Sequence, residues 1–491
     1  MKPPRRNPET VVQYARGHDF LSFSDFSETK EEEACPFLFV NGWYAITRRA
    51  ELSFRHCFSA PSLGLFVTLV IGWVLTVGRH TISGVNLTMG LHESRNFSSV
   101  YRFVSRGRWI ADMVSHALFQ FMSEILALEG AEIHVIVDDT LNKHRGRTIT
   151  GAGWQHDGSA FGKRNRKGYG VCFVIIGLAV RLDGIADRVF CLPYAARLWW
   201  PPRAKNKPKR MAYKTKPELA VELIQLTRSW MDDSQLLRVI VDKGYTCKTV
   251  INGRPPGTEI TGRIRMGSAL YELPEQSAVP HRGRPRKKGR RMPPLATLFQ
   301  DRTLKWDQMP TDSGPKAKAR RVYAFTAIWY HAVGNKPLRF ALSHDLSGTY
   351  ADTIFLDTDL RAPAHEIIGR YTMRSSIEVT IRESKELLGA AHPQCRKEQS
   401  VARAPLFAYW TYCFVVLWFV RNFQTARFLA ADPGPWYRHK KYFSFSDMLA
   451  AARRSHFRVA LFGRSPSTQS FIKNQSSALY APNKVYSKRE T

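Results

Sequence analysis

Residues 371–385 read YTMRSSIEVTIRESK, and this stretch decides how the rest of the chain is interpreted. On a continuous helix, which turns by about 100° per residue, four of its side chains would share one narrow stripe: Tyr371, Arg374, Glu378 and Lys385. A carboxylate with a cation on each side suits a metal ion that grips a phosphate, because the carboxylate holds the metal and the cations hold phosphate oxygens. A solvated helix face can have the same pattern, since Arg and Glu four residues apart form an ordinary surface pair. The remainder of the chain has to distinguish the two.

The composition indicates a globular protein with a polyanionic partner. The chain has 491 residues, of which 44% are hydrophobic, and its 73 Lys and Arg against 41 Asp and Glu give a formal net charge of +32. Such an excess favours nucleic acid as the partner, with an anionic membrane surface as the competitor. The seven cysteines contain no Cys-x-x-Cys spacing. They argue against a zinc ribbon or a disulfide framework and fit a reducing cell interior, so we expect a cytoplasmic protein.

Two apolar stretches, 63–78 and 406–420, are at or below the length of about 17–25 residues that a bilayer-spanning helix needs. Basic residues lie close to both. We therefore expect buried helices of a large core, with no membrane as a partner. The first 20 residues have no apolar segment behind their charges, and no signal peptide is expected.

The N-terminal part divides into a polar, flexible arm at 1–36 and a helical region at 37–130. The helical region has a short helix-turn-helix rhythm with four polar residues that could face DNA: Ser98, Arg102, Arg106 and Arg108. We expect a DNA-binding region here. A plain helical bundle that supports the next domain is the alternative.

From residue 131 to 265 the pattern is that of an α/β domain. β-branched runs predict five strands with two helices between the later ones, which is the order of a mixed sheet. The strands are 131–139, 171–180, 188–194, 236–242 and 258–265, one helix is 217–233, and residues 243–251 form a turn and the other helix. The first strand ends on Asp138 and Asp139, and the fourth ends on Asp242. Carboxylates at neighbouring strand ends can build a metal site on a rigid scaffold.

Residues 266–350 predict a β-rich insertion with strands at 302–309, 321–333 and 337–344. The segment contains the dense basic run HRGRPRKKGRR at 281–291, which is too rich in Gly and Pro for a helix. Its Arg-Gly-Arg-Pro core is similar to an AT-hook, an extended reader of the minor groove. A solvated loop that touches phosphates without sequence preference is the alternative. Either way we expect DNA contacts from Arg282, Arg284, Arg286, Lys287 and Lys288.

The C-terminal third predicts a strand at 353–360 and one helix that runs from Pro363 to about Leu388 and carries Glu378. An apolar helix at 404–424 follows, and 351–425 is expected to complete the α/β domain. Residues 426–491 form a helical C-terminal region with a helix at 445–462 and a polar tail.

The intervals of the opening stretch, Y-x2-R-x3-E-x6-K, match the YREK signature of DDE insertion-sequence transposases of the insertion-sequence-four superfamily, a group of bacterial cut-and-paste transposases. VIVDDT at 135–140 and VIVDKGYT at 239–246 resemble the strands that carry the first and second Asp of that family. The resemblance covers roughly residues 95–425. In one departure from the common pattern, Ser375 stands where many relatives have Trp after the arginine.

The resemblance implies an RNase H-like catalytic core, a mixed five-stranded sheet with flanking helices, interrupted by the β-rich insertion. It also implies that Asp138, Asp242 and Glu378 are the catalytic residues and the ligands of two Mg or Mn ions, which such enzymes hold about 3.5–4 Å apart. Asp139 is the alternative first ligand, because adjacent residues of a strand point to opposite faces.

By the same resemblance, the phosphates at the transposon end would be held by Tyr371, Arg374 and Lys385. Cleavage would pass through a DNA hairpin, and an extruded base would stack on Trp329 or Trp306, for which core packing is the alternative role. The partners implied are double-stranded DNA, both the terminal inverted repeats and the target, and a second copy of the chain in a homodimer. The competing hypothesis is a domesticated or inactive transposase that only binds DNA.

Overall fold

The computed structural model describes residues 52–94, 98–128, 130, 132–158, 166–202, 212–274, 286–309, 320–348, 350–430 and 440–462. The predicted arm at 1–36, the C-terminal tail after 462 and the first half of the basic run, with Arg282 and Arg284, lie outside these residues. The described chain divides into two compact units, one containing Ser53–Cys413 and the other containing Phe414 and the residues after it.

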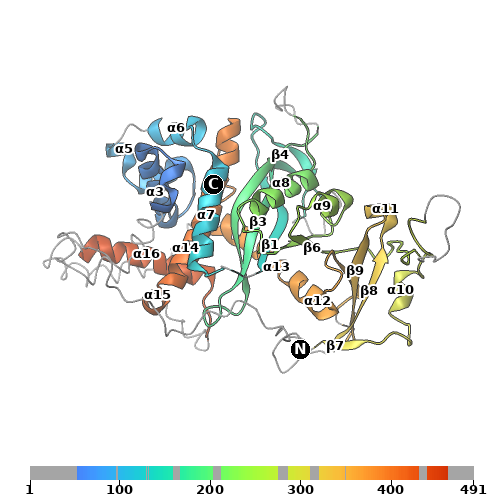
Figure 1. Cartoon of the computed structure of the whole chain (residues 1–491). Coiled ribbons are helices and arrows are strands. Elements are labelled where there is room, and N and C mark those ends of the chain that lie inside the picture. The colour runs from blue at the N-terminus through green and yellow to red at the C-terminus, as the bar shows by residue number, and fades with distance from the viewer. Residues whose placement is uncertain are drawn as a thin grey trace, which may run out of the picture. The chain divides into compact units, whose positions relative to one another are not determined.

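In the first unit, ten strands of the described chain form one mixed sheet (Figure 1). Its order is β2-β3-β1-β5-β6-β10-β9-β8-β7, with β4 paired to β3 as well. The strands are β1 Ile133–Lys143, β2 Gly153–His156, β3 Lys167–Arg181, β4 Val189–Trp199, β5 Leu237–Val241, β6 Thr258–Arg263, β7 Asp307–Met309, β8 Arg320–Ile328, β9 Pro337–Asp345 and β10 Thr353–Asp357.

The sheet combines both pairing directions, as predicted. β1 and β5 are parallel, as are β5 and β6, whereas β1 with β3 and β3 with β4 are antiparallel. β10 pairs antiparallel with β6 on one side and with β9 on the other. The strands predicted for the insertion therefore extend the same hydrogen-bonded sheet.

Two predicted strands are shorter than the sequence indicated. The strand predicted at 302–309 is limited to β7, because the Asp301 carboxylate accepts hydrogen bonds from the backbone and hydroxyl of Thr303 and fixes a turn there. The strand predicted at 321–333 ends at Ile328, opposite Pro337, where its partner β9 begins. The short edge strand β2 was not predicted.

Helices precede the sheet and cover it. α8 and α13 lie on opposite faces, because β1 side chains of opposite orientation contact residues from the two helix regions: Asp139 meets Lys216 at the start of α8, and Asp138 meets Arg374 just before α13. The helices of this unit are 3₁₀-helix η1 Arg55–Cys57, α3 Ala60–Leu75, α4 Ile82–Thr88, α5 Leu91–Ser94, α6 Ser98–Arg106, α7 Ala111–Ile125, α8 Lys216–Arg228, α9 Lys248–Gly253, α10 Leu295–Leu298, α11 Tyr330–Val333, α12 Ala364–Thr372, α13 Ser375–Glu386 and the first part of α14 Glu398–Arg421.

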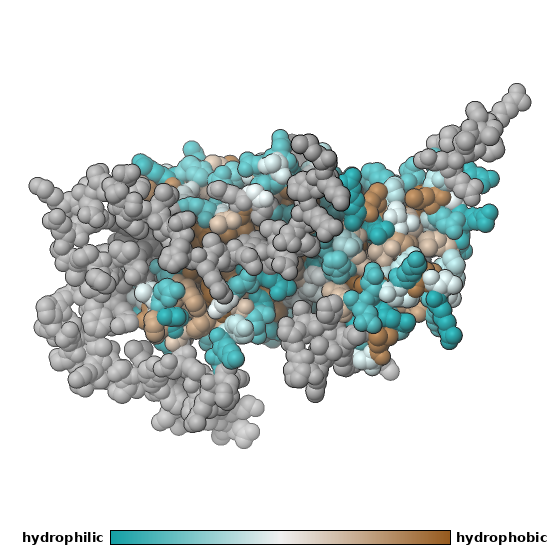
Figure 2. Space-filling view, turned by 60° about the horizontal axis from the view of Figure 1, so that its bottom comes forward, coloured by the Kyte–Doolittle hydropathy of each residue, from teal (hydrophilic) through white to brown (hydrophobic). Residues whose placement is uncertain are grey.

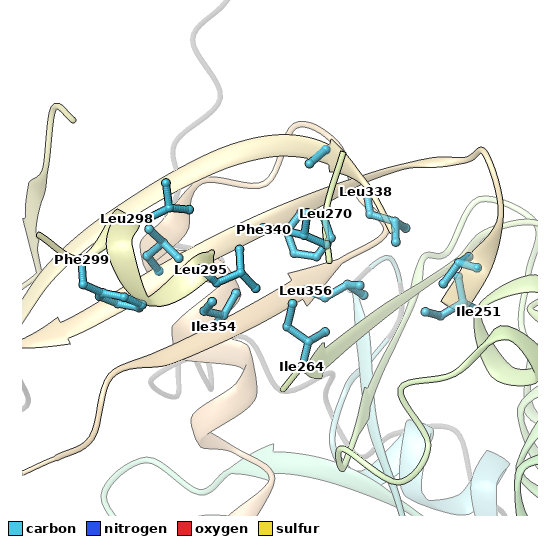
Figure 3. Packing of buried hydrophobic residues seen from close by; sticks show 13 residues of the cluster. Ile251, Ile264, Leu270, Leu295, Leu298, Phe299, Leu338, Phe340, Ile354 and Leu356 are labelled. Carbon is cyan, nitrogen blue, oxygen red and sulfur yellow. The ribbon is translucent and has the colours of Figure 1, made fainter. Parts of the chain in front are cut away.

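A hydrophobic cluster stabilises the half of the sheet formed by β8–β10 (Figure 3). Leu295 and Leu298 of α10 lie over the sheet, where Phe340 and Ile354 project toward them. Each of these side chains is at least 90% buried, and complete burial of one such side chain contributes about 1.5–3 kcal/mol. The cluster thus holds the predicted insertion strands firmly to their covering segments.

The two apolar stretches pack against each other. In α3, Phe66 and Trp73 lie 6.0 and 5.6 Å, between ring centroids, from Phe407 of α14. The Trp73 indole also donates a hydrogen bond to the Leu388 carbonyl. By length and composition, α14 is the one helix in the described chain that could cross a membrane, yet 89% of its apolar window is buried within the protein. In the view of Figure 2, hydrophilic and hydrophobic side chains are interspersed over the surface of the described residues.

The second unit contains the end of α14, α15 Phe423–Leu429 and α16 Phe445–Phe462. Three phenylalanine rings pack together at centroid distances of 5.2–5.9 Å: Phe419, Phe423 and Phe443. The helix predicted at 445–462 coincides with α16.

Candidate active site

Strand register brings two of the predicted carboxylates together. β1 and β5 run parallel, and their last paired residues are Val137 and Val241. Asp138 follows Val137 on β1, and Asp242 is the first residue after β5, so the two aspartates emerge side by side. The prediction that the first strand ends at its aspartates was wrong: β1 continues to Lys143, because its antiparallel partner β3 is longer than β5 and pairs with it to that point.

The two neighbouring aspartates of β1 face opposite sides of the sheet, as the alternation of a strand requires. Asp138 accepts a hydrogen bond from the Arg374 guanidinium at 3.3 Å. On the other face, Asp139 accepts one from the Tyr245 hydroxyl at 2.9 Å and forms an ion pair with Lys216. Asp138 therefore faces the stretch that contains Glu378, whereas Asp139 is bonded to Tyr245 and Lys216 on the opposite face of the sheet.

The single helix predicted from Pro363 to Leu388 is in fact two helices, α12 and α13, and this prediction was wrong. Between them the backbone hydrogen bonds shorten to the i→i−3 type, with Arg374 donating to Tyr371 and Ser376 donating to Met373. The hydroxyls of Ser375 and Ser376 bind carbonyls three residues back, which competes with the regular helical pattern. The four polar residues of the opening stretch consequently do not lie on one helical stripe.

The Arg374 guanidinium lies among all three predicted carboxylates. It is 2.8 Å from Glu378, 3.3 Å from Asp138 and 3.4 Å from Asp242 in nitrogen-to-oxygen distance. Asp138 lies on β1, Asp242 directly follows β5, and Glu378 lies on α13. Three separate elements therefore direct one carboxylate each to the same guanidinium. We call the group formed by Asp138, Asp242, Glu378 and Arg374 the carboxylate cluster.

The carboxylate cluster is closed on one side and open on the other. The side chain of Asp138 is 15% exposed, that of Asp242 40% and that of Glu378 57%. Burial raises the pKa of the Asp138 carboxyl to about 7, against the opposing effect of the Arg374 charge. Burial by itself would lower the pKa of Arg374, but the surrounding carboxylates raise it above its ordinary value. The buried end of the cluster is shielded from water, and its open end is accessible from water.

The donor set of the cluster fits hard divalent cations such as Mg or Mn, which prefer carboxylate oxygens. In addition, the Arg374 Nε, which lies 3.4 Å from Asp242, makes no hydrogen bond to a described residue, so this contact is an ion pair without hydrogen-bond geometry. Among the residues that the structure describes, no three ligating side chains are already arranged to hold a metal ion together. A metal would therefore have to replace the guanidinium at the centre of the cluster.

The other two residues of the predicted signature have different surroundings: the charges of the cluster act on Tyr371, whereas the charges that act on Lys385 come from Lys143 and Asp157, outside the cluster. The Tyr371 ring packs on Phe355 at 4.9 Å between centroids, and burial raises the pKa of its hydroxyl. Lys385 donates a hydrogen bond to the Leu141 carbonyl of β1 at 2.9 Å, and burial lowers the pKa of its ammonium to about 8. Tyr371 is on α12 and Lys385 is on α13, and neither forms an ion pair with the carboxylates of the cluster.

The predicted DNA-contacting residues of the insertion have mixed environments. Trp329 and Trp306 are both partly buried and pack against the cluster of Figure 3. Lys288 lies over the rings of Tyr271 and Tyr330, at 3.8 and 4.6 Å. Two other predicted contacts, Arg286 and Lys287, are exposed, while Arg282 and Arg284 lie outside the described residues.

Sequence reasoning missed the residues that anchor α13. Glu383 accepts two hydrogen bonds from the Arg188 guanidinium, both at 2.8 Å, and a third from the Tyr412 hydroxyl at 2.8 Å. This network ties the helix of Glu378 to the start of β4 and to α14. The partners are 195 and 29 residues away from Glu383, so no local spacing could have indicated them.

The chain matches a known protein family. The model of the DDE superfamily endonucleases matches residues 54–330, more than half of the chain. The matched part includes Asp138 and Asp242 and ends before Glu378. No match was found among curated proteins.

Proposed function

The chain belongs to the DDE superfamily endonucleases, and we propose that it is a DNA transposase that cleaves the ends of a mobile element and joins them to target DNA. The observation that carries this proposal is the convergence of Asp138, Asp242 and Glu378 on one cation. Family membership makes DNA the substrate class, and the net charge of +32 agrees with a polyanionic partner.

In this proposal the three carboxylates hold two divalent ions, Mg or Mn. When bound, such ions activate the attacking water or 3′-hydroxyl and stabilise the leaving oxygen of the phosphodiester. Asp138 and Asp242 belong to the rigid sheet, whereas Glu378 comes from α13, so the position of α13 decides whether the ligand set is complete. Asp139 is not a ligand in this proposal, because Lys216 and Tyr245 occupy it on the opposite face.

Arg374 has a second role in the proposal. Once the carboxylates hold metal, its guanidinium is released from them and can hold a DNA phosphate with two parallel hydrogen bonds. Tyr371 and Lys385 would contact neighbouring phosphates of the transposon end, Lys385 from its position beside Leu141 of β1. This assignment keeps the predicted roles of the three residues, although they occupy two helices and the turn between them.

We further propose an RNase H-like catalytic core. β4, β3 and β1 run antiparallel, β5 and β6 continue parallel to β1, and α8 and α13 flank these five strands, which supports that architecture. β7–β9 would then be the insertion, and the helical region from α3 to α7 would bind DNA. A homodimer, a hairpin intermediate and an extruded base near Trp329 or Trp306 belong to the same proposal.

The proposal is tested by DNA cleavage with the Glu378→Gln variant, which removes a charged ligand while keeping the size of the side chain. With Mg and DNA carrying the ends of the element, we expect the wild type to cut and the variant to lose cleavage by at least about 100-fold, while both bind the ends with similar affinity. Glu386→Gln, an exposed position on the same helix, is the matched control and should cleave normally.

Cleavage at the wild-type rate by Glu378→Gln would remove Glu378 from the active site. Tight binding of the ends by the wild type without any cleavage would favour the competing hypothesis of an inactive, DNA-binding transposase.

A further inference from the structure

A second polar site lies outside the carboxylate cluster. A pocket of about 550 Å³ is formed by the turn before α4, by α6 and by the segment that leads into α14. None of the residues that line it belongs to the carboxylate cluster or to the predicted YREK signature. Its walls come from parts of the chain about 300 residues apart, within the first unit.

Three exposed cations line this pocket: Arg79, Arg396 and Lys397. None of the three forms an ion pair with a described residue, and no aspartate or glutamate of the described chain lines the pocket. Three positive charges that share a concave surface without a counter-charge repel one another unless an anion lies between them. The pocket therefore favours an anionic ligand.

Hydroxyl groups lie on the facing wall. The hydroxyls of Ser83 and Tyr101 are 2.6 Å apart and hydrogen-bonded to each other, and the Ser105 hydroxyl donates to the Tyr101 carbonyl. Hydroxyls together with Arg and Lys are the side chains that most often contact phosphate oxygens in complexes with DNA. The lining chemistry is that of a phosphate site.

The walls of the pocket are fixed in place. The His80 backbone donates a hydrogen bond to the His392 ring at 3.2 Å, and the Thr150 backbone donates one to the Arg396 carbonyl at 3.2 Å. These bonds connect the turn before α4 and the loop after β1 to the segment before α14. A phosphate-binding site with fixed walls loses little entropy when its ligand binds.

We propose that this pocket binds a backbone phosphate of duplex DNA at a distance along the chain from the cleavage site. The inference rests on the proposed function, because it takes DNA as the substrate. A backbone phosphate fits better than a free small anion because the positive surface continues beyond the pocket: α6 also carries exposed Arg102 and Arg106. The pocket would position the duplex and would carry no sequence information itself.

The test uses the full chain, a short mixed-sequence DNA duplex and fluorescence anisotropy at several salt concentrations. In the triple variant Arg79→Gln/Arg396→Gln/Lys397→Gln, we expect the affinity at physiological salt to fall about 10-fold or more. We also expect the slope of log affinity against log salt to become shallower by about 0.9, the amount for one lost phosphate contact.

The matched control is Arg55→Gln/Arg181→Gln/Lys248→Gln, which removes the same charge from exposed positions outside the pocket. It should change affinity and slope much less. A second variant, Ser83→Trp, fills the pocket without a change in charge and should also weaken binding. Thermal melting of each variant checks that it is folded.

Equal losses in the two triple variants would overturn the inference, because the effect would then be one of net charge. Unchanged DNA affinity in the pocket variants would overturn it too, including the case in which inorganic phosphate stabilises only the wild type against melting and thereby identifies a small-anion site. These outcomes leave the proposed nuclease function standing. Absence of any DNA binding by the wild type would contradict both.

Discussion

Arg374 places one positive charge among three carboxylates that would otherwise repel one another. Its distances of 2.8–3.4 Å to Glu378, Asp138 and Asp242 make it the centre of the carboxylate cluster in the absence of metal. In the proposed function the same arginine contacts a DNA phosphate when the carboxylates hold metal.

This role predicts a stability defect that metal repairs. Replacing Arg374 by Ala should lower the free energy of unfolding without metal by about 1–3 kcal/mol, because the buried Asp138 carboxylate loses its partner. Added Mg should restore more stability to the variant than to the wild type, since it supplies the missing charge. Urea unfolding with and without Mg measures both, and Arg382→Ala, at an exposed position of α13, is the control. Identical Mg responses in wild type and Arg374→Ala would count against the account.

At the residue scale, the family resemblance favoured Asp138 over Asp139 as the first ligand, but local sequence pattern could not show which of the two faces the helix of Glu378. The alternation of β1 settles only that Asp138 and Asp139 face opposite sides. Which side is the site depends on Arg374 and Lys216, which are 236 and 77 residues away. Such long-range partners leave no trace in local spacing.

The α12–α13 segment is helical where a helix was predicted, but it forms two helices and not one. The spacing of Tyr371, Arg374, Glu378 and Lys385 indicated a helix, and helices are present there, but two serines turn the middle of it into a tighter bend. Periodicity averages over many residues and does not report a local competition for carbonyl oxygens.

The position of α13 depends on Glu383, and this gives a prediction for the element. Glu383→Gln should reduce the free energy of unfolding by about 2–3 kcal/mol, because the Arg188 guanidinium, 27% exposed, loses its charged partner. DNA cleavage should fall as well, since Glu378 lies on the same helix. Urea unfolding and a cleavage assay measure the two effects, with Glu386→Gln as the control. Unchanged stability of Glu383→Gln would show that the network does not hold α13.

At the scale of the whole molecule, charge and strand order were predictable, whereas the extent of the sheet was not. The excess of Lys and Arg indicated a polyanionic partner, and the mixed sheet followed from the order of β-branched runs. The insertion strands were expected to form a domain of their own. They join the same sheet because β10 returns to pair with both β6 and β9, a pairing between distant segments that sequence pattern does not encode.

Folding should also depend on pH through His134 on β1. Burial lowers the pKa of this imidazole to about 4, with Arg370 and Arg238 nearby lowering it further and Glu132 opposing them. In the unfolded chain its pKa is about 6.5, so between these two values the unfolded state binds a proton that the folded state does not. Stability should therefore fall as the pH decreases from about 6.5 to 4, by up to about 3 kcal/mol from this group.

Urea unfolding from pH 7 to pH 5 tests this dependence by comparing the wild type with His134→Gln. The variant should lose less stability over the interval, because it has no imidazole at this position to protonate on unfolding. Parallel curves for the two proteins would contradict the assigned role of His134.

The most direct test of the carboxylate cluster as a metal site is a titration with Mn followed by electron paramagnetic resonance. The account predicts that the wild type binds Mn and that Asp138→Asn, Asp242→Asn and Glu378→Gln each weaken binding by about 10-fold or more, in the range known for changes at metal sites. Asp139→Asn should bind Mn like the wild type, since Lys216 and Tyr245 hold that residue on the other face. Undiminished Mn binding in the first three variants, or its loss in Asp139→Asn alone, would contradict the account.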